Sequence, residues 1–185
     1  MKYNLIVAVC RGNGIGYNNA IPWHIAGDLS YFSKLTKGNG NNVVVMGSHT
    51  WKSIEKYNKN ENGLSGRHNF ILSASGSVNI SKISKSNKNI KTFPSIDAVT
   101  AYLDDTSSLA EYDEVWIIGG ADIYSGFLTQ DRINACYVTY IDMDFQCDTF
   151  FPNFLGKLPW KETQRTTTFD DIYECVVDYV VYNRM

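Results

Sequence analysis

The amino-acid sequence predicts an α/β fold, in which a single domain has a mostly parallel central β-sheet, antiparallel C-terminal strands and flanking helices. Three observations lead to this prediction. Residues 5–10 form a continuous apolar run, which is typical of a strand buried on both faces. Residues 114–118 follow a helix with a serine cap at Ser95 and lead through two glycines into another helical pattern, as in a βα unit. Residues 135–141 and 172–182 are aromatic and β-branched with no helical pattern between them, which predicts an antiparallel end to the sheet.

Length and composition limit the class of protein. The chain has 185 residues, of which 44% are hydrophobic, and this suits one domain with a sizeable core. Its 17 basic and 19 acidic residues give a net charge of −2 without a basic stripe, so neither a nucleic-acid nor a membrane-surface partner is expected. No apolar segment is long enough to span a bilayer, and the run near the N-terminus is too short for a signal peptide.

The cysteines and histidines do not follow a metal-binding pattern. The four cysteines show no C-x-x-C spacing, and the three histidines are far apart in the sequence. We therefore expect no metal site and no disulfide framework. Reduced thiols in a cytoplasmic protein are the simpler interpretation.

A glycine-rich loop at residues 11–19 follows the first strand. A G-x-G-x-x-G dinucleotide fingerprint that starts at Gly12 would need glycine where Tyr17 stands, so the spacing fails. Glycines at this density are typical of a mobile surface loop, and a lid over a binding site fits the same pattern.

Residues 20–32 connect this loop to the first helix and carry one acid, Asp28. Pro22 predicts a stiff, non-helical corner, and apolar residues recur at helical spacing from Asp28 onward. Asp28 has two interpretations. It caps the helix, or it points into an apolar pocket under Trp23 and Phe32, where burial raises its pKa and a flat amidine-like edge could bind.

The middle of the chain predicts alternating strands and helices. Strands are expected at residues 43–46 and 69–72, with a helix between them that opens at Gly47. Residues 56–66 are polar and rich in asparagine, which predicts a loop or a surface insertion. Residues 73–91 predict a polar edge of the domain.

Two strand-to-helix junctions predict an anion site. Gly47-Ser48-His49-Thr50 and Gly119-Gly120-Ala121-Asp122 each place glycines at a helix N-terminus, where unpaired N–H groups face outward. A ligand with two phosphates could bridge the junctions at the carboxyl ends of the strands. The alternative is that each glycine only permits a tight turn, and both interpretations stay open.

Several short motifs occur in order along almost the whole chain. They are Ile21-Pro22-Trp23 followed by Asp28 and Tyr31-Phe32; Met46-Gly47-Ser48-His49-Thr50-Trp51 with Ser53-Ile54; Gly66-Arg67 with Asn69; Ile118-Gly119-Gly120 with Tyr124; Val138-Thr139; and Asp148-Thr149-Phe150-Phe151-Pro152. Each motif is weak alone. Together they are specific, and the chain resembles the dihydrofolate reductase family.

The resemblance implies hydride transfer from NADPH to 7,8-dihydrofolate, which yields 5,6,7,8-tetrahydrofolate for one-carbon and thymidylate metabolism. Asp28 would bind the amino-pyrimidine edge of the pterin through both carboxylate oxygens and favour protonation of the ring nitrogen beside the carbon that receives hydride. Trp23 would hold a water that delivers this proton, and Thr139 would hydrogen-bond the Asp28 carboxylate. The resemblance also implies a monomer that binds antifolate-type small molecules.

The resemblance further implies a substrate pocket. Arg67 would clamp the carboxylate of the glutamate tail with its planar guanidinium, whereas without the resemblance it would be interpreted as solvated surface. The apolar members of the pocket are also compatible with an ordinary core. The implied substrate-binding residues are Ile6, Val7 and Ala8 beneath the pterin, Phe32 stacked on it, Leu29, Ile54 and Leu64 around the aminobenzoyl group, and Asp28, Arg67, Ile118, Tyr124 and Thr139.

On the cofactor side, the resemblance implies a site for nicotinamide and pyrophosphate, with a cis peptide between Gly119 and Gly120. Residues 11–20 would form a lid that excludes water during hydride transfer. The implied cofactor-binding residues are Ala8, Ile15, Gly16, Ile21, Gly47, Ser48, His49, Thr50, Leu72, Ser73, Ala74, Ser75, Ile118, Gly119, Gly120, Ala121, Asp122, Ile123 and Tyr124.

Three positions depart from the family pattern. Ser48 stands where the family usually has arginine or lysine for the ribose phosphate of NADPH, and Ala74 stands where arginine or serine often contributes. Asp122 adds a negative charge to the pyrophosphate helix. We therefore expect NADPH as the cofactor, with weakened discrimination against NADH. The 56–66 insertion also lengthens the loop before Arg67.

Other functions compete with this prediction. Within the same fold, the runner-up is the pyrimidine-reducing enzyme of riboflavin synthesis, which lacks the pairing of Asp28 with Phe32 and the Arg67 clamp. A different class would be a catalytically silent nucleotide-binding module or a structural α/β domain, in which Asp28 only caps its helix.

Overall fold

The computed structural model describes residues 1–58, 62–74, 87–105, 111–154 and 159–185. Within these ranges, eight strands form the main sheet: β1 (Lys2–Val9), β3 (Val43–Gly47), β4 (His68–Leu72), β5 (Ile90–Phe93), β6 (Glu114–Ile117), β7 (Ala135–Ile141), β9 (Trp160–Asp170) and β10 (Cys175–Arg184). A small sheet pairs β2 (Gly14–Gly16) with β8 (Thr149–Phe150). The helices are α1 (Ala26–Lys37), α2 (Ser48–Asn58), α3 (Ile96–Asp104) and α5 (Ala121–Thr129), with a 3₁₀ turn η1 (Arg11–Asn13).

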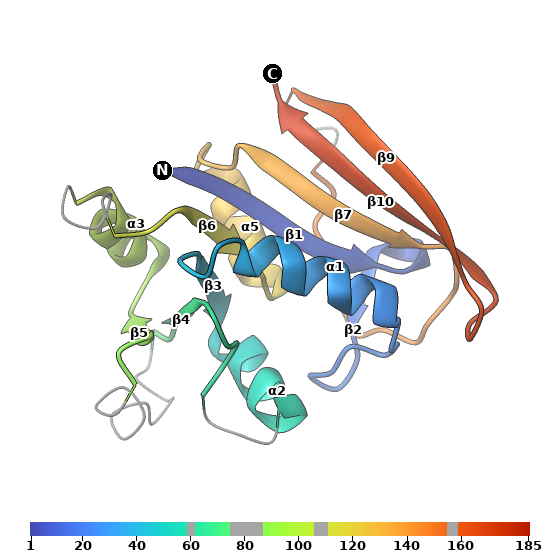
Figure 1. Ribbon diagram of the computed structural model, residues 1–185, viewed down its shortest axis with the longest axis horizontal. Helices are drawn as coiled ribbons and strands as arrows, with labels where there is room; N and C mark the ends of the chain where they lie inside the picture. Colours follow the sequence, from blue (N-terminus) through green and yellow to red (C-terminus); the bar gives the residue numbers. More distant parts are fainter. Residues whose placement is uncertain (59–61, 75–86, 106–110, 155–158) are drawn as a thin grey trace.

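The main sheet has the strand order β5-β4-β3-β6-β1-β7-β10-β9. Neighbouring strands from β5 to β7 are parallel, whereas β10 runs antiparallel to both β7 and β9. In Figure 1 the orange and red C-terminal strands form one side of the sheet and the green strands β4 and β5 lie at the other. The predicted fold class, a mostly parallel sheet with antiparallel C-terminal strands and flanking helices, is confirmed.

The two faces of the sheet are covered by different helices, because successive side chains on a strand point to opposite faces. Ile6 packs with Phe32 of α1 and Trp51 of α2 on one face. Its neighbour Leu5 packs on the other face with Phe127 of α5, where residues of α3 also lie. Figure 1 shows α1 in front of the sheet and α5 behind it. This burial on both sides explains why the parallel strands read as continuous apolar runs.

The two C-terminal strands differ from the sequence prediction. β10 begins at Cys175 and residues 171–174 form a turn, so the strand predicted at residues 172–182 was placed too early. β9 was not predicted at all. It is an edge strand in which residues 161–169 are exposed, so its sequence carries no apolar alternation that would reveal it.

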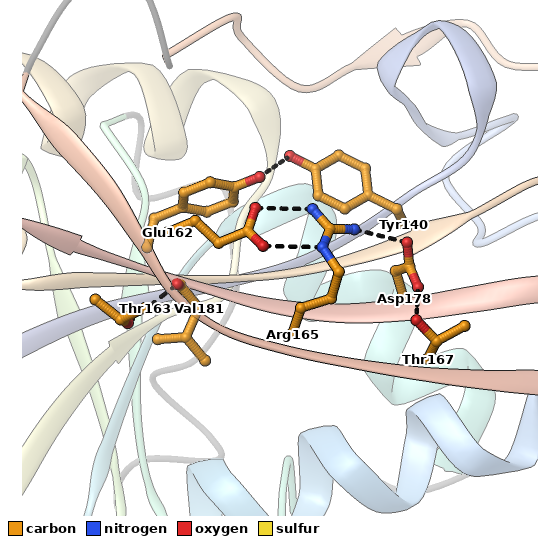
Figure 2. Close-up of polar contacts among 8 residues, drawn as sticks. Tyr140, Glu162, Thr163, Arg165, Thr167, Asp178 and Val181 are labelled. Carbon is orange, nitrogen blue, oxygen red and sulfur yellow. Dashed lines mark hydrogen bonds and ion pairs between the residues drawn. The ribbon is translucent and has the colours of Figure 1, made fainter.

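Polar side chains on the exposed face of β9 and β10 form a network (Figure 2). Arg165 of β9 makes ion pairs with Glu162 at 2.8 Å and with Asp178 of β10 at 2.6 Å. The Thr167 hydroxyl donates a hydrogen bond to the second oxygen of Asp178 at 2.5 Å. These contacts join the edge strand to its neighbour without apolar burial.

Other element boundaries also differ from the prediction. α2 continues to Asn58, past the start of the predicted 56–66 loop, and β5 overlaps the end of the predicted polar edge at residues 73–91. Residues 75–86 of that edge lie outside the described part of the chain. The predicted loop at residues 11–19 contains η1 and β2, and β2 depends on backbone pairing with β8 rather than on a side-chain pattern.

The serine cap predicted for the third helix is confirmed, because the Ser95 hydroxyl accepts a hydrogen bond from the Ala98 N–H at 3.1 Å. Membrane crossing by a helix would need a longer and more apolar element than any helix in the described ranges. In the same residues, no group of three or more histidine, cysteine, aspartate or glutamate side chains is arranged to hold a metal ion.

Candidate active site

Asp28 lies in the first turn of α1 and does not cap it. The helix begins at Ala26, and its N-cap residue is Ile25, which has an extended backbone. The interpretation of Asp28 as the helix cap is therefore wrong. The sequence placed the start of the helix too late, at Asp28. Ala26 and Gly27 belong to the first turn, but they have no large apolar side chain that would mark them as helical in the sequence.

The Asp28 carboxyl is held in a partly buried position beside the sheet. Burial raises its pKa above the ordinary value of 3.8, and the Thr139 side chain acts in the opposite direction. Thr139 therefore lies close enough to the Asp28 carboxyl to lower its pKa, and the hydrogen bond that the family resemblance implies between them stays a prediction. Thr139 is itself buried, and the sheet register places it beside Ala8 of β1 and Tyr179 of β10.

No ion pair to Asp28 is found within the described residues. A partly buried carboxylate with one hydroxyl neighbour keeps unused acceptor sites on its two oxygens. Such a group can bind a ligand that presents hydrogen-bond donors in one plane.

Apolar side chains from several elements pack in one cluster on the α1 side of the sheet. Phe32 lies one helical turn after Asp28, so both residues share a face of α1. This cluster contains five of the predicted substrate-binding residues, namely Ile6, Phe32, Ile54, Leu64 and Ile118.

The remaining apolar candidates lie in different surroundings. Ala8 and Trp23 belong to a neighbouring cluster, in which the buried Trp23 ring contacts Phe145 with 5.2 Å between ring centroids. Val7 packs in the core on the opposite face of β1, so its side chain is not brought to the Phe32 cluster. Leu29 is half-buried on α1.

The negative charge of Asp28 contributes to raised pKa values of three tyrosines. Burial raises the pKa of Tyr31 to about 12, with smaller contributions from Tyr137, Tyr179 and Asp28. Burial also raises the pKa values of Tyr124 and Tyr179, and Asp28 adds to both shifts. The Tyr31 and Tyr179 rings are 4.5 Å apart between centroids. Burial therefore favours the neutral phenol form of all three tyrosines.

Arg67 is a buried residue, with 6% of its surface exposed, so its interpretation as solvated surface is wrong. Its Nε donates to the Ser65 carbonyl at 3.1 Å, and its Nη1 donates to the Thr36 hydroxyl at 2.8 Å. The guanidinium carbon lies 5.9 Å from the centroid of the Phe32 ring. The structure thus places a fixed cation beside one wall of the Phe32 cluster.

Arg67 also lines a cavity of about 370 Å³ at the end of α2. The cavity is lined by Asn58, Asn62, Gly63, Leu64, Ser65 and Arg67. The position of this cavity suits an extended anionic part of a ligand whose flat part contacts Phe32.

The two glycine junctions come together at the carboxyl ends of β3 and β6. The Gly47 N–H donates to the Gly119 carbonyl at 2.8 Å, and the peptide between Gly119 and Gly120 is cis, as expected from the resemblance. A Cβ added at Gly47 would lie 3.1 Å from Ile123, and one added at Gly120 would lie 3.6 Å from the Thr50 hydroxyl. The N-termini of α2 and α5 are therefore neighbours, and their unpaired N–H groups face one region.

Comparisons with known proteins decide the family. The family model for dihydrofolate reductase matches residues 2–184. This chain belongs to the dihydrofolate reductase family.

Named relatives agree with the family model. The chain is 34% identical over 185 residues to dihydrofolate reductase type 3 of Salmonella typhimurium, covering 100% of this chain and 99% of the relative. It is 33% identical over 159 residues to dihydrofolate reductase of Heliothis virescens, covering 83% and 80% of the two chains. A bifunctional dihydrofolate reductase-thymidylate synthase of Arabidopsis thaliana is 35% identical over 154 residues, which are 81% of this chain and 26% of the relative.

Membership of the dihydrofolate reductase family implies a nicotinamide cofactor, and the residues at the glycine junctions fit one. Ser73 follows β4, and its hydroxyl is buried with no hydrogen-bond partner among the described residues. Ser48 is half-buried at the start of α2, whereas His49 and Asp122 are exposed. These positions offer uncharged donors, and Asp122 is the one charged group among them.

Other cofactor candidates are spread more widely. Leu72 is buried at the end of β4, and Ala74, two residues later, is exposed. Ser75 lies outside the described residues. Ala121 and Ile123 are half-buried in the first turn of α5. Tyr124 is buried in the same turn, and its hydroxyl donates to the Ile6 carbonyl at 2.8 Å, which ties α5 to β1.

The predicted lid contacts a second loop. Ile15 and Gly16 are half-buried in β2, whereas Ile21 is 56% exposed. The Asp148 N–H donates to the Gly16 carbonyl at 3.0 Å, and the Asn18 N–H donates to the Asp148 carboxylate at 2.9 Å. Residues 11–20, the predicted lid of this dihydrofolate reductase family member, therefore contact Asp148.

Sequence reasoning missed two residues of the site. Thr36, which holds Arg67, lies four residues after Phe32 on the same helix face, so helical spacing could have found it. Tyr179 contacts the Tyr31 ring from the antiparallel strand β10, with the two rings tilted by 51°. It had no sequence signal, because its position depends on pairing between β7 and β10.

Proposed function

We propose that this chain reduces 7,8-dihydrofolate to 5,6,7,8-tetrahydrofolate with NADPH as the hydride donor. The observation that carries the proposal is the partly buried Asp28 carboxyl, which has a raised pKa and lies close to Thr139. Family membership supports the reaction, and the geometry of the site supports the roles of individual residues.

Asp28 binds the flat amino-pyrimidine edge of the substrate. Its two oxygens accept parallel hydrogen bonds, and Thr139 keeps the carboxylate in one orientation. The charge of Asp28 favours the protonated form of the pterin. Because Asp28 lies at the edge opposite the reacting nitrogen, the proton arrives through water, and Trp23 is the residue proposed to hold it.

The apolar cluster and Arg67 bind the rest of the substrate. Phe32 stacks on the pterin, while Ile54 and Leu64 contact the aminobenzoyl group. Arg67 binds a carboxylate of the glutamate tail, because its guanidinium is already oriented by Ser65 and Thr36.

NADPH supplies the hydride when it is bound. The N–H groups at the starts of α2 and α5 bind its pyrophosphate beside Gly47, Gly119 and Gly120. Ser48 and Ser73 donate hydrogen bonds to the ribose phosphate. Since neither is a cation and Asp122 is an anion, discrimination between NADPH and NADH is weaker than an arginine would provide.

We also propose that the protein is a cytoplasmic monomer, that it supplies tetrahydrofolate to one-carbon and thymidylate metabolism, and that antifolate-type molecules bind in the same pocket. The absence of a basic stripe in the sequence supports a small-molecule substrate over a nucleic acid.

The test is the loss of NADPH absorbance when dihydrofolate is added to the purified chain. Turnover that needs both compounds is the expected result. The Asp28→Asn variant serves as the matched control, because it keeps the size of the side chain and removes its charge. NADH that served with equal or better efficiency than NADPH would contradict the cofactor assignment.

A further inference from the structure

Two cysteines that are 137 positions apart in the sequence meet at the base of the lid. The Sγ atoms of Cys10 and Cys147 are 3.7 Å apart. Cys10 follows β1 and is buried, and Cys147 lies between β7 and β8 and is half-buried. A disulfide has an S–S length of about 2.0 Å, so an approach of about 1.7 Å would join the two sulfurs.

The backbone around this pair leaves space for both sulfurs. A Cβ added at Gly14 would lie 2.5 Å from the Cys147 sulfur and 2.8 Å from the Cys10 sulfur. Any larger residue at position 14 would push the thiols away. Among the described residues, no such sulfur–sulfur approach is found for Cys136 or for Cys175, although Cys175 packs in the same hydrophobic cluster as Cys10 and Cys147.

We propose that Cys10 and Cys147 form a reversible oxidation site, at which a peroxide joins the two thiols in one intramolecular disulfide. Two S–H bonds break and one S–S bond forms. The two electrons and two protons reduce hydrogen peroxide to two molecules of water. A dithiol reductant reverses the modification by thiol–disulfide exchange.

The disulfide would join two loops that already touch. The Arg11 N–H donates to the Met143 carbonyl at 3.1 Å, and Arg11 forms ion pairs with Asp142 at 2.8 Å and Asp144 at 3.3 Å. Together with the contacts of Asp148 to the lid, these bonds hold residues 11–20 against residues 142–148. A covalent link prevents the two loops from separating.

The environment of Cys147 disfavours its thiolate form. Burial raises the pKa of Cys147 to about 11, with contributions from the adjacent Cys10 thiol and the Asp148 carboxylate, while a backbone hydrogen bond with Gly16 acts in the opposite direction. Because the thiolate is the reactive form, the disulfide forms slowly at neutral pH and faster in mildly alkaline buffer.

The first experiment counts free thiols after treatment with hydrogen peroxide in mildly alkaline buffer and denaturation. The wild-type chain has four cysteines and is expected to keep two free thiols, with a mass loss of two hydrogens and a cross-linked peptide that contains Cys10 and Cys147. Cys10→Ser and Cys147→Ser are each expected to keep three. Cys175→Ser, the matched control, is expected to fall from three to one.

The proposal is overturned if the wild type keeps four free thiols, or if Cys10→Ser loses thiols as the wild type does. The second experiment measures turnover, and this part alone rests on the proposed function. Oxidation is expected to lower the rate several-fold in the wild type and in Cys175→Ser, with recovery in dithiothreitol, and to leave the rate of Cys147→Ser unchanged.

The two proposals fail in different ways. If the chain with all its thiols reduced did not turn over dihydrofolate, the proposed function would be contradicted. The thiol count would still test the oxidation site. A chain that carries the disulfide and keeps its full rate would overturn the link between oxidation and lid movement.

Discussion

Two carboxylates, Asp28 beside the sheet and Glu162 on the exposed edge, have pKa values that are shifted in opposite directions by their surroundings. Glu162 is paired with Arg165 across two hydrogen bonds, and this guanidinium holds the pKa of Glu162 below its ordinary value (Figure 2). Asp28 has no such cation in the described ranges, and burial raises its pKa. The edge network is complete within the protein, whereas the proposed function assigns a ligand to the Asp28 carboxylate. The comparison predicts that changes at the pocket alter function and that changes at the edge alter stability slightly.

The largest effect is expected at the pocket acid. Asp28→Asn should lower turnover at neutral pH by about 10²- to 10⁴-fold, because the amide neither carries the charge nor accepts two hydrogen bonds from the substrate edge. Turnover should partly recover in acid, where the substrate is already protonated. Rates measured across the pH range by NADPH absorbance test this, and an Asp28→Asn rate equal to wild type would remove Asp28 from the mechanism.

The next largest effect is expected at the buried arginine. Arg67→Lys should raise KM for dihydrofolate by about tenfold to hundredfold, since an ammonium cannot reproduce the planar, two-bond contact with a carboxylate. A dihydropteroate substrate without the glutamate tail is the matched control, and its KM should change little. Equal changes for both substrates would show that Arg67 only supports the fold.

A smaller effect is expected at the start of α2. Ser48→Arg should increase the ratio of kcat/KM for NADPH over that for NADH by about tenfold, because the new cation pairs with the ribose phosphate. The variant should leave KM for dihydrofolate unchanged. A ratio that stays at the wild-type value would place the phosphate away from residue 48.

The pocket acid should also influence stability in a pH-dependent way. Its folded-state pKa is raised, so the folded chain holds this proton more tightly than the unfolded chain does. The stabilising contribution is therefore complete below the ordinary pKa of 3.8 and is lost as pH rises through the folded value. Asp28→Asn should remove this loss. Urea unfolding near pH 3.8 and at about pH 8 should show a smaller decrease in the free energy of unfolding for the variant than for wild type.

The smallest effect is expected on the exposed edge. Arg165→Ala should lower Tm by less than about 4 °C and leave turnover unchanged, because exposed ion pairs contribute little and are screened by salt. Lys161→Ala on the same strand is the control. A large loss of turnover in Arg165→Ala would contradict the functional separation of the two regions.

Several features of the site were predictable because they depend on neighbours in the sequence. Helical spacing placed Asp28 and Phe32 on one face of α1, and the glycines before α2 and α5 marked both helix N-termini. The family motifs predicted the contact between Thr139 and Asp28, which lie 111 positions apart and which no local pattern could connect.

Other features were decided by the tertiary structure alone. The burial of Arg67 depends on Thr36 from another element, and Tyr179 reaches Tyr31 only because β10 pairs with β7. The contact of Cys10 with Cys147 has the same origin.

The amino-acid sequence by itself determined the α/β class and the positions of most helices. These features follow from apolar periodicity and from residue types that act within a few positions of one another. The edge strand β9, the surroundings of Arg67 and the thiol pair were decided by the folded chain. They depend on contacts between segments that are far apart in the sequence, and the apolar periodicity of one segment does not show which other segment it contacts.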